Sequence, residues 1–362
     1  MNGFIPDIVA RNYRGKDFSG SFDGSVLFFD MTGFTQMTTQ LMQHDKKGAE
    51  ILSQLLQELF GRIVDSIHQE GGFISTFAGD AATAIFPEKS SSNVFNAAFK
   101  IRKIFDELHI QQTEFGEFLL DVKIGIDSGI INWGIFAFNN QSAFFFKGEP
   151  IDGAAKSEQA ANKRKIIATE HAKNLANQEQ YSFNKHMDTL FTVNTQEQTI
   201  SSSNSKKSIS SIDANKPIKQ RDEIEKNFYP LEKLILKSSG EFRNITSVFF
   251  SFNDDSFKAF QHTAQTIYNL AQDFDGYVNV LDFGDKGGVI LVLFGAPISH
   301  ENDTIRAVSF AEAATTLLSN SIRVGISTGT AFTGVIGGTN RKTYTALGSV
   351  VNLSARIVLK AE

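Results

Sequence analysis

Cysteine is absent from this sequence of 362 residues, so disulfide bonds, thiolate metal sites and cysteine nucleophiles are all excluded. No apolar run is long enough to span a membrane, and residues 1–16 lack the apolar core of a signal peptide. Clusters of lysine and arginine are missing too, and the net charge of −5 is spread over both halves of the chain. These absences indicate a soluble, cytoplasmic protein and argue against a nucleic-acid partner.

Hydrophobic residues are plentiful, since they make up 41% of the chain and include 34 phenylalanines. A chain of this length and composition can form two domains, each with its own buried core. In the first half the apolar patterns predict a strand, a helix, a hairpin, a helix and a strand, followed by another hairpin and a helix. This order indicates an α+β fold in which helices pack on a mainly antiparallel sheet.

The stretch 25–87 holds two carboxylates at the ends of predicted strands. The apolar run 26–29 ends in Asp30, and a turn marked by Gly33 follows it. Apolar residues then recur at helical spacing over 51–67, and the runs 73–77 and 81–86 flank a turn that contains Asp80. If this hairpin pairs beside the first strand, Asp30 and Asp80 lie at the same edge of one sheet.

Two carboxylates held side by side repel each other unless cations lie between them. Mg²⁺ suits such a pair, because it binds through one or two carboxylates together with substrate phosphates, and a paired-metal site suits in-line displacement at phosphorus. Taken singly, Asp30 is explained as a helix N-cap and Asp80 as a turn residue. Their joint placement favours a metal site.

The second half of the chain repeats the first. Residues 322–326, Ile-Arg-Val-Gly-Ile, match 122–126, Val-Lys-Ile-Gly-Ile, and residues 348–352 match 148–152 at the same offset of 200. A shared offset indicates an internal duplication. We therefore expect an N-terminal arm at 1–24, a first domain at 25–190, a linker and second arm at 191–240, and a second domain at 241–362.

The two copies differ in their polar residues. Phe252 stands at the position that we assign to Asp30, and a glycine near Gly288 stands where Asp80 would be. The second copy instead carries Asn352 and Arg356, which lie four residues apart on one helix face. A pseudo-twofold dimer of the copies would thus build one complete site and one degenerate site.

Three motifs resemble the signatures of class III nucleotidyl cyclases: Phe-Phe-Asp-Met-Thr-Gly-Phe-Thr at 28–35, Phe-Ala-Gly-Asp at 77–80, and the segment 344–356. The tandem arrangement most resembles the soluble adenylyl cyclases. The resemblance implies two ferredoxin-like cyclase homology domains that form an intramolecular pseudo-twofold heterodimer. It also implies conversion of ATP to 3′,5′-cyclic AMP and pyrophosphate with two Mg²⁺ (or Mn²⁺) ions.

The resemblance also assigns roles to individual positions. The metal ligands would be Asp30, Asp80 and the backbone of Met31. The phosphate-binding residues would be Thr32, Gly33, Phe34, Thr35 and Lys123. Asn352 would orient the ribose, and Arg356 would stabilise charge that develops on the α-phosphate. Base recognition would fall to the positions of Val280, Thr345 and Ala346.

Some positions depart from the family pattern. Val280 stands where adenylyl cyclases of this type place a lysine, and a valine side chain cannot donate a hydrogen bond to the base. Thr76 and Ala155 replace basic residues that are associated with bicarbonate binding, so bicarbonate stimulation is not expected. The base preference is therefore open, and another nucleoside triphosphate remains an alternative substrate.

Two further alternatives come from other functional classes. One is a nucleotide-binding regulatory module without catalysis, and the other is a palm-type nucleotidyl polymerase, which shares paired carboxylates but needs a basic channel. The sequence stops at Glu362, soon after the helix that carries Arg356, whereas the first copy continues through the run 166–169. We therefore expect further residues and domains on the C-terminal side in the native protein.

Overall fold

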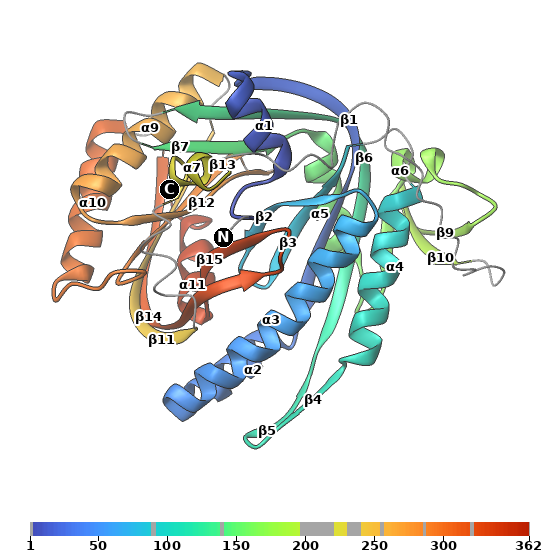
Figure 1. Cartoon of the computed structure of the whole chain (residues 1–362), viewed down its shortest axis with the longest axis horizontal. Coiled ribbons are helices and arrows are strands. Elements are labelled where there is room, and N and C mark those ends of the chain that lie inside the picture. Colours follow the sequence, from blue (N-terminus) through green and yellow to red (C-terminus); the bar gives the residue numbers. More distant parts are fainter. Residues whose placement is uncertain are drawn as a thin grey trace.

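The computed structural model describes residues 3–87, 92–137, 141–195, 221–229, 240–253, 257–284, 287–318 and 322–361. Two large β-sheets dominate this part of the chain, and helices pack on both of them (Figure 1). None of the described helices combines the length and the apolar character that crossing a bilayer requires. Residues 196–220 and 230–239, which belong to the predicted linker, lie outside the described residues.

The first sheet has eight strands in the order β2-β3-β1-β6-β8-β10-β9, and β7 pairs with β6. Its strands are β1 (Ser19–Thr32), β2 (Phe73–Ala78), β3 (Ala81–Phe86), β6 (Asp121–Ala137), β7 (Ser142–Lys147), β8 (Ile166–Thr169), β9 (Tyr181–Met187) and β10 (Leu190–Thr195), and a small separate ladder joins β4 (Ile110–Thr113) to β5 (Gly116–Leu119). The helices are α1 (Asp7–Gly15), α2 (Phe34–Leu41), η1 (Met42–His44), α3 (Asp45–Gln69), α4 (Ser92–Glu107), α5 (Glu149–Ala160) and α6 (Glu170–Leu175).

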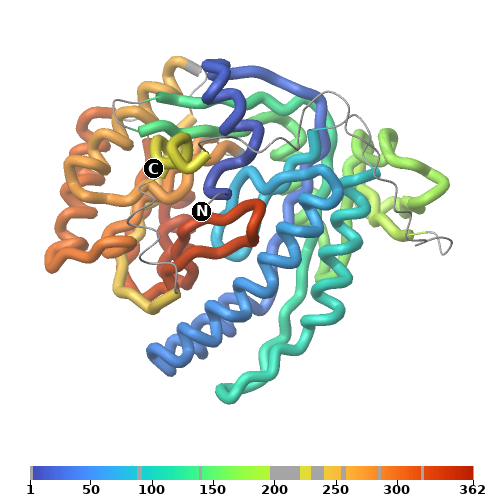
Figure 2. The backbone as a smooth tube through the Cα atoms, viewed as in Figure 1, coloured from blue at the N-terminus to red at the C-terminus, as the bar shows by residue number. Residues whose placement is uncertain are grey.

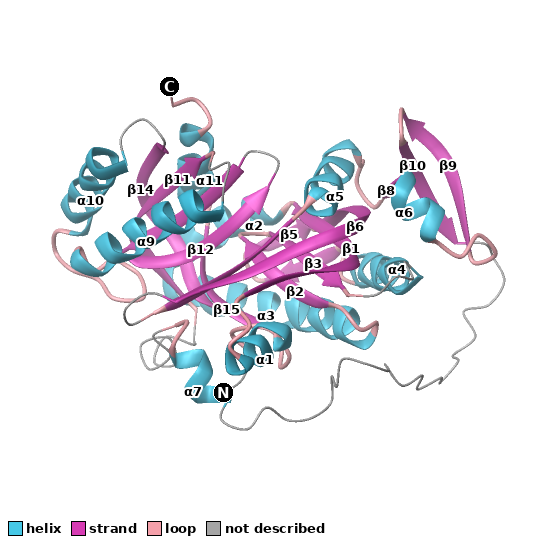
Figure 3. Ribbon diagram, turned by 90° about the horizontal axis from the view of Figure 1, so that it is seen from above, coloured by secondary structure: helices cyan, strands magenta, loops and turns pink. Residues whose placement is uncertain are grey.

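The second sheet has five strands in the order β12-β13-β11-β14-β15. These are β11 (Glu241–Phe252), β12 (Tyr277–Gly284), β13 (Gly287–Phe294), β14 (Ile322–Gly337) and β15 (Lys342–Leu347), and the helices are α7 (Arg221–Lys226), α9 (Phe257–Asp273), α10 (Asp303–Leu318) and α11 (Ser349–Val358). Seen from above, α9 and α10 lie at one end of the molecule and the β9–β10 hairpin projects at the other (Figure 3).

Strand register shows how the two copies correspond. Phe29 lies opposite Ile124 in the first copy, and Phe250 lies opposite Val324 in the second. The offset of 200 between Ile124 and Val324 makes Phe29 equivalent to Phe250. Asp30 therefore corresponds to Ser251, and our alignment of Asp30 with Phe252 was wrong by one residue.

The same registers confirm the glycine predicted at the other carboxylate position. Ala82 faces Phe29, and Ile290 faces Phe250, so these two residues correspond and Gly288 replaces Asp80. The residues just before them, Gly79 and Gly287, both have positive φ. This alignment could not be derived from the sequence alone, because it depends on which residues face one another across the sheet.

Each copy extends a long hairpin that packs against the other copy. From the first copy, Phe136 of β6 and Phe145 of β7 pack into a buried cluster that also contains Phe260 of α9. From the second copy, Phe332 of β14 and Leu347 of β15 are buried in the cluster that includes α3. In Figure 1 the β14–β15 hairpin accordingly lies beside α3. This reciprocal packing forms the intramolecular pseudo-twofold heterodimer.

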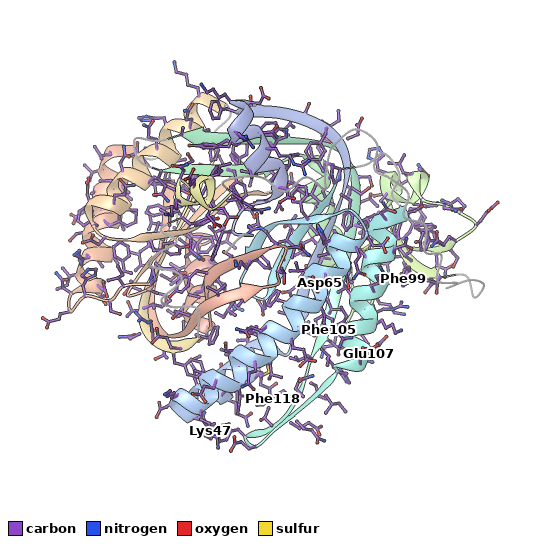
Figure 4. All side chains as sticks on the ribbon, viewed as in Figure 1. Lys47, Asp65, Phe99, Phe105, Glu107 and Phe118 are labelled. Carbon is purple, nitrogen blue, oxygen red and sulfur yellow. The ribbon has the colours of Figure 1, made fainter. Side chains whose placement is uncertain are left out.

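Helices α3 and α4 run side by side and cover the first sheet (Figure 4). In this view Lys47 and Asp65 lie at two points along α3, while Phe99, Phe105 and Glu107 lie along α4. Phe105 is fully buried, and apolar residues of both helices recur at helical spacing on the faces that meet the sheet. The sequence prediction of both helices is confirmed.

A buried arginine ties the N-terminal segment to both copies. Arg341, only 4% exposed and just before β15, donates from Nε to the carbonyl oxygen of Ile74 in β2 at 3.0 Å and from Nη1 to that of Phe4 at 2.6 Å. Glu225 of α7 accepts the backbone N–H of Gly3 at 2.8 Å. The N-terminal segment consequently lies beside the β14–β15 hairpin (Figure 2).

Candidate active site at the seam between the copies

Asp30 and Asp80 meet at one end of the first sheet. Asp30 is near the end of β1, opposite Ala81, and Asp80 directly precedes Ala81 in the tight turn between β2 and β3. The backbone N–H of Met31 donates to the carbonyl oxygen of Asp80 at 3.3 Å, which links the turn to the end of β1. Local strand and turn geometry thus holds the two carboxylates together.

The electrostatics of this pair favour a bound cation. The pKa of Asp30 is raised from 3.8 to about 7, mainly by burial and in addition by the charges of Asp80 and Glu158, against the opposing effect of Lys123 and a backbone hydrogen bond from Met31. Burial also raises the pKa of Asp80. The protein alone therefore disfavours the charged form of both carboxyl groups. A divalent cation bound beside them would stabilise that charged form.

The turn that follows Asp30 depends on a glycine. Gly33 has φ 90° and precedes the first residue of α2, and a Cβ atom on it would come within 2.0 Å of the carbonyl oxygen of Leu119. Only glycine fits both conditions. The turn leads into the N-terminus of α2, whose first backbone N–H groups can bind phosphate oxygens.

Two hydroxyl groups near this turn are buried without a hydrogen-bond partner in the described part of the chain. They belong to Thr32, which ends β1, and to Thr38 of α2. Thr38 lines a narrow pocket together with Thr35 and Asp80. Unpaired buried hydroxyls are costly, so these two are additional candidates for polar contact with a ligand. Sequence reasoning missed Thr38 because one threonine in a helix carries no pattern.

The second copy supplies the other wall of this pocket. Ala346 and Asn352, which lie in β15 and α11, line it opposite Thr35 and Asp80. A wider cavity of about 330 Å³ is lined by Thr35, Asn352 and Arg356. Since Thr35 and Asn352 line both cavities, the two are neighbouring parts of one groove that extends from Asp80 to Arg356.

Lys123 lies close to this groove but has a partner of its own. It faces Asp30 across the β1–β6 ladder, and its Nζ lies 2.6 Å from Oε1 of Glu158, which is 5% exposed. The ammonium group of Lys123, which we predict to bind phosphate, is therefore already paired with the carboxylate of Glu158 in α5. Phosphate binding by Lys123 stays a prediction and requires exchange of this ion pair.

The three predicted base-binding positions do not all line the groove. Ala346 lines the pocket beside Asp80, whereas Val280 lines a separate small cavity of about 40 Å³ at the seam, together with Thr76 and Asn279. Thr345, 2% exposed, is hydrogen-bonded to Asn279. Asn279 was not among the residues selected from the sequence.

Comparison with known proteins supports a single family. Residues 21–200 match the family model described as the adenylate and guanylate cyclase catalytic domain. Human adenylate cyclase type 10 is 25% identical over a 405-residue alignment that covers 98% of this chain, and hence both copies. The chain belongs to the class III nucleotidyl cyclases. An uncharacterized protein of Mycobacterium tuberculosis is 26% identical over 170 residues, covering 45% of this chain and 29% of its own length.

The fold of this class III cyclase has a solved counterpart. A class III adenylyl cyclase-like ATP-binding protein from Pseudomonas aeruginosa superposes with a TM-score of 0.62 and covers 95% of this chain and 82% of its own, at 13% identity. The likeness supports the tandem arrangement of two cyclase domains. The chain spans about a quarter of the length of human adenylate cyclase type 10.

The donor set of this cyclase fits divalent metal ions. Asp30 and Asp80 offer hard carboxylate oxygens, as Mg²⁺ prefers, and burial raises the pKa of each. No group of three or more His, Cys, Asp or Glu residues suited to hold a metal occurs among the described residues. A site with two carboxylates therefore needs substrate phosphates to complete the coordination.

The second seam of this cyclase is degenerate. Ser251 and Gly288 occupy the positions of Asp30 and Asp80, so neither of these two positions carries a carboxylate in the second copy. On the other side of this seam, the side chain of Thr76 in β2 is hydrogen-bonded to Asp282 of β12, near the charge of Asp152. These carboxylates disfavour an anion, and the absence of bicarbonate stimulation stays a prediction.

We predict that Asp282→Asn stabilises the protein at pH 8 but not at pH 4. The pKa of Asp282 is raised from 3.8 to about 7, mainly by burial and also by the charge of Asp152, while hydrogen bonds from Phe283 and Thr76 oppose the shift. Because the folded-state pKa is above the unfolded value, stability is lost as the pH rises from about 4 to about 7. Asparagine carries no charge and avoids that loss.

Urea denaturation of both proteins at the two pH values measures the difference. The control is Asp273→Asn, since Asp273 is exposed at the end of α9. An equal effect of Asp282→Asn at pH 4 and pH 8 would contradict the assigned cause.

Proposed function

We propose that this chain is an adenylate cyclase that converts ATP to 3′,5′-cyclic AMP and pyrophosphate at one site between its two copies. The observation that carries this proposal is the groove at the seam, where Asp80 of the first copy and Asn352 of the second line the same pocket. Arg356 lies in the adjoining cavity. The groove therefore combines Asp80, whose charge acts on the neighbouring Asp30, with groups that suit a ribose and a phosphate.

Each residue of the candidate site has a proposed task. Asp30 and Asp80, with the backbone of Met31, would hold two Mg²⁺ or Mn²⁺ ions, which when bound activate the ribose 3′-oxygen and neutralise triphosphate charge. The N-terminus of α2 binds phosphate oxygens through backbone N–H groups at Phe34 and Thr35.

Residues of the second copy orient the substrate and stabilise charge. Asn352 donates or accepts a hydrogen bond at the ribose, so that the 3′-oxygen faces the α-phosphorus in line with the departing pyrophosphate. Arg356 is exposed, and no described residue forms an ion pair with it. Its guanidinium is thus available to stabilise negative charge on the α-phosphate during the displacement.

The test is to incubate the chain with Mg²⁺ or Mn²⁺ and, separately, with ATP, GTP, CTP and UTP, and to identify the products by mass spectrometry. We expect 3′,5′-cyclic AMP and pyrophosphate from ATP, at a rate that exceeds those with the other nucleotides and falls to background with a chelator. Absence of a cyclic product from all four nucleotides, in a sample that is folded by circular dichroism, would refute the proposal.

A second candidate is a nucleotide-binding regulatory module without catalysis. It is favoured by one observation: Val280 replaces the lysine expected for base binding and lines a cavity apart from the groove. Under this alternative, ATP raises the melting temperature while no product forms. The same nucleotide panel, read by thermal shift and by mass spectrometry, separates the two functions.

A further inference from the structure

A β-bulge in β12 turns Asn279 toward β15. The register of β12 against β13 shifts between Val278 and Val280, which leaves Asn279 as the extra residue. β2 of the first copy has the same shift between Ile74 and Thr76, around Ser75. Bulges re-aim side chains and are frequent beside functional sites. Asn279 is 7% exposed, so its amide must find its partners inside the protein.

The hydrogen bonds of Asn279 fix the orientation of its amide. Nδ2 lies 2.6 Å from the carbonyl oxygen of Tyr344, and that oxygen can only accept, so the NH₂ end of the amide must face it. The other end, Oδ1, then faces Thr345 and can only accept as well. The hydroxyl of Thr345 therefore donates its single proton to Oδ1, at 3.4 Å. Only its acceptor lone pairs remain for another group.

Thr345 lies between the groove and the seam cavity. Alternate residues of a strand share a face, so Thr343, Thr345 and Leu347 are on one face of β15. Leu347 lines the pocket beside Asp80, and Thr343 lines the cavity beside Asn279. If the base extends from the proposed ribose position along this face, it meets the hydroxyl of Thr345.

We propose that Asn279 is a specificity-determining positioning residue, which holds the Thr345 hydroxyl as an acceptor so that the site selects a 6-aminopurine over a 6-oxopurine. This inference rests on the proposed function and concerns its substrate. An N–H at the 6-position of adenine satisfies the lone pair that Thr345 presents. A carbonyl oxygen at the same position places acceptor against acceptor, with no proton between them.

The experiment compares ATP with inosine triphosphate, which has an oxo group at position 6 and a hydrogen on N1, where ATP has an amino group and an unprotonated nitrogen. The ratio of kcat/KM for ATP over inosine triphosphate is measured in the wild-type chain, Asn279→Ala and Asn279→Leu. Freed from Asn279, the hydroxyl can rotate and donate to the oxo group, so we expect the ratio to fall by about tenfold. The matched control is Ser75→Ala at the equivalent bulge, which should retain the wild-type ratio.

The variant Thr345→Val provides the second part of the experiment. It should lower the ratio as far as Asn279→Ala does, and the double variant should lower it no further, because Asn279 acts through Thr345. A merely structural role would change kcat/KM for both nucleotides alike and leave the ratio intact. If neither Asn279 variant folds, Thr345→Val decides: a ratio equal to the wild type's overturns the proposal.

Failure of the proposed reaction can be told apart from failure of this inference. If the chain binds the nucleotides without turnover, the adenylate cyclase proposal fails, and the ratio of dissociation constants from calorimetry decides the role of Asn279. Equal affinity of the wild type for both nucleotides, or an unchanged ratio in folded Asn279→Ala, overturns the inference. Absence of any nucleotide binding overturns both.

Discussion

Asp30→Asn should lower kcat for cyclic AMP formation by at least about 10³-fold, because metal-ion stabilisation worth several kcal/mol depends on the carboxylate pair. The asparagine keeps the size of the side chain but removes the charge that holds the cation beside Asp80. The measurement is the initial rate with saturating Mn²⁺ and ATP. Ser251→Ala is the matched control, since Ser251 is the equivalent buried residue of the degenerate seam and should retain activity.

The same substitution should make the metal-free protein more stable above pH 7. The pKa of Asp30 is raised from 3.8 to about 7, so the native protein loses stability as the pH rises between these values, and asparagine avoids that loss. Thermal unfolding without divalent ions should show a higher melting temperature for Asp30→Asn at pH 8 and no gain at pH 4. A variant that is both inactive and less stable at pH 8 would instead point to a structural role.

Arg356→Ala should lower kcat by about 10² to 10³-fold and change KM for ATP little, as expected for a contact that forms mainly as charge develops in the transition state. Arg356 is exposed on α11, so its removal should leave the fold intact. Steady-state kinetics with ATP separate kcat from KM.

The duplication provides the control for this variant. Lys156 is the exposed residue at the equivalent position of α5. Lys156→Ala should keep kcat within a factor of about two. A rise of KM in Arg356→Ala with unchanged kcat would mean that the arginine binds ground state and transition state equally, contrary to the assigned role.

Local patterns in the sequence were sufficient to predict much of the fold. The strand that carries Asp30, the helix α3 and the β2–β3 hairpin follow one another within about sixty residues, and each has its own periodicity or turn signal. The duplication was visible because the two copies keep a constant spacing. The β4–β5 hairpin was missed, since its few apolar residues alternate too briefly to stand out.

Other features depend on contacts between distant parts of the chain. The equivalence of Asp30 with Ser251 follows from strand register, which a single inserted residue displaces in a linear alignment. The ion pair of Lys123 with Glu158 joins β6 to α5, and no spacing rule connects residues so far apart. The groove between Asp80 and Asn352 likewise brings together residues separated by most of the sequence.

By itself the sequence determined which residues can do chemistry here: a carboxylate pair in one copy, an asparagine and an arginine in the other, and a fold class to carry them. Only the tertiary structure decided how these residues are partnered, including the bulge that turns Asn279 toward Thr345. The physical reason is that hydrogen-bonding partners of buried groups are set by packing between strands and copies, whereas periodicity and turn chemistry act only between near neighbours.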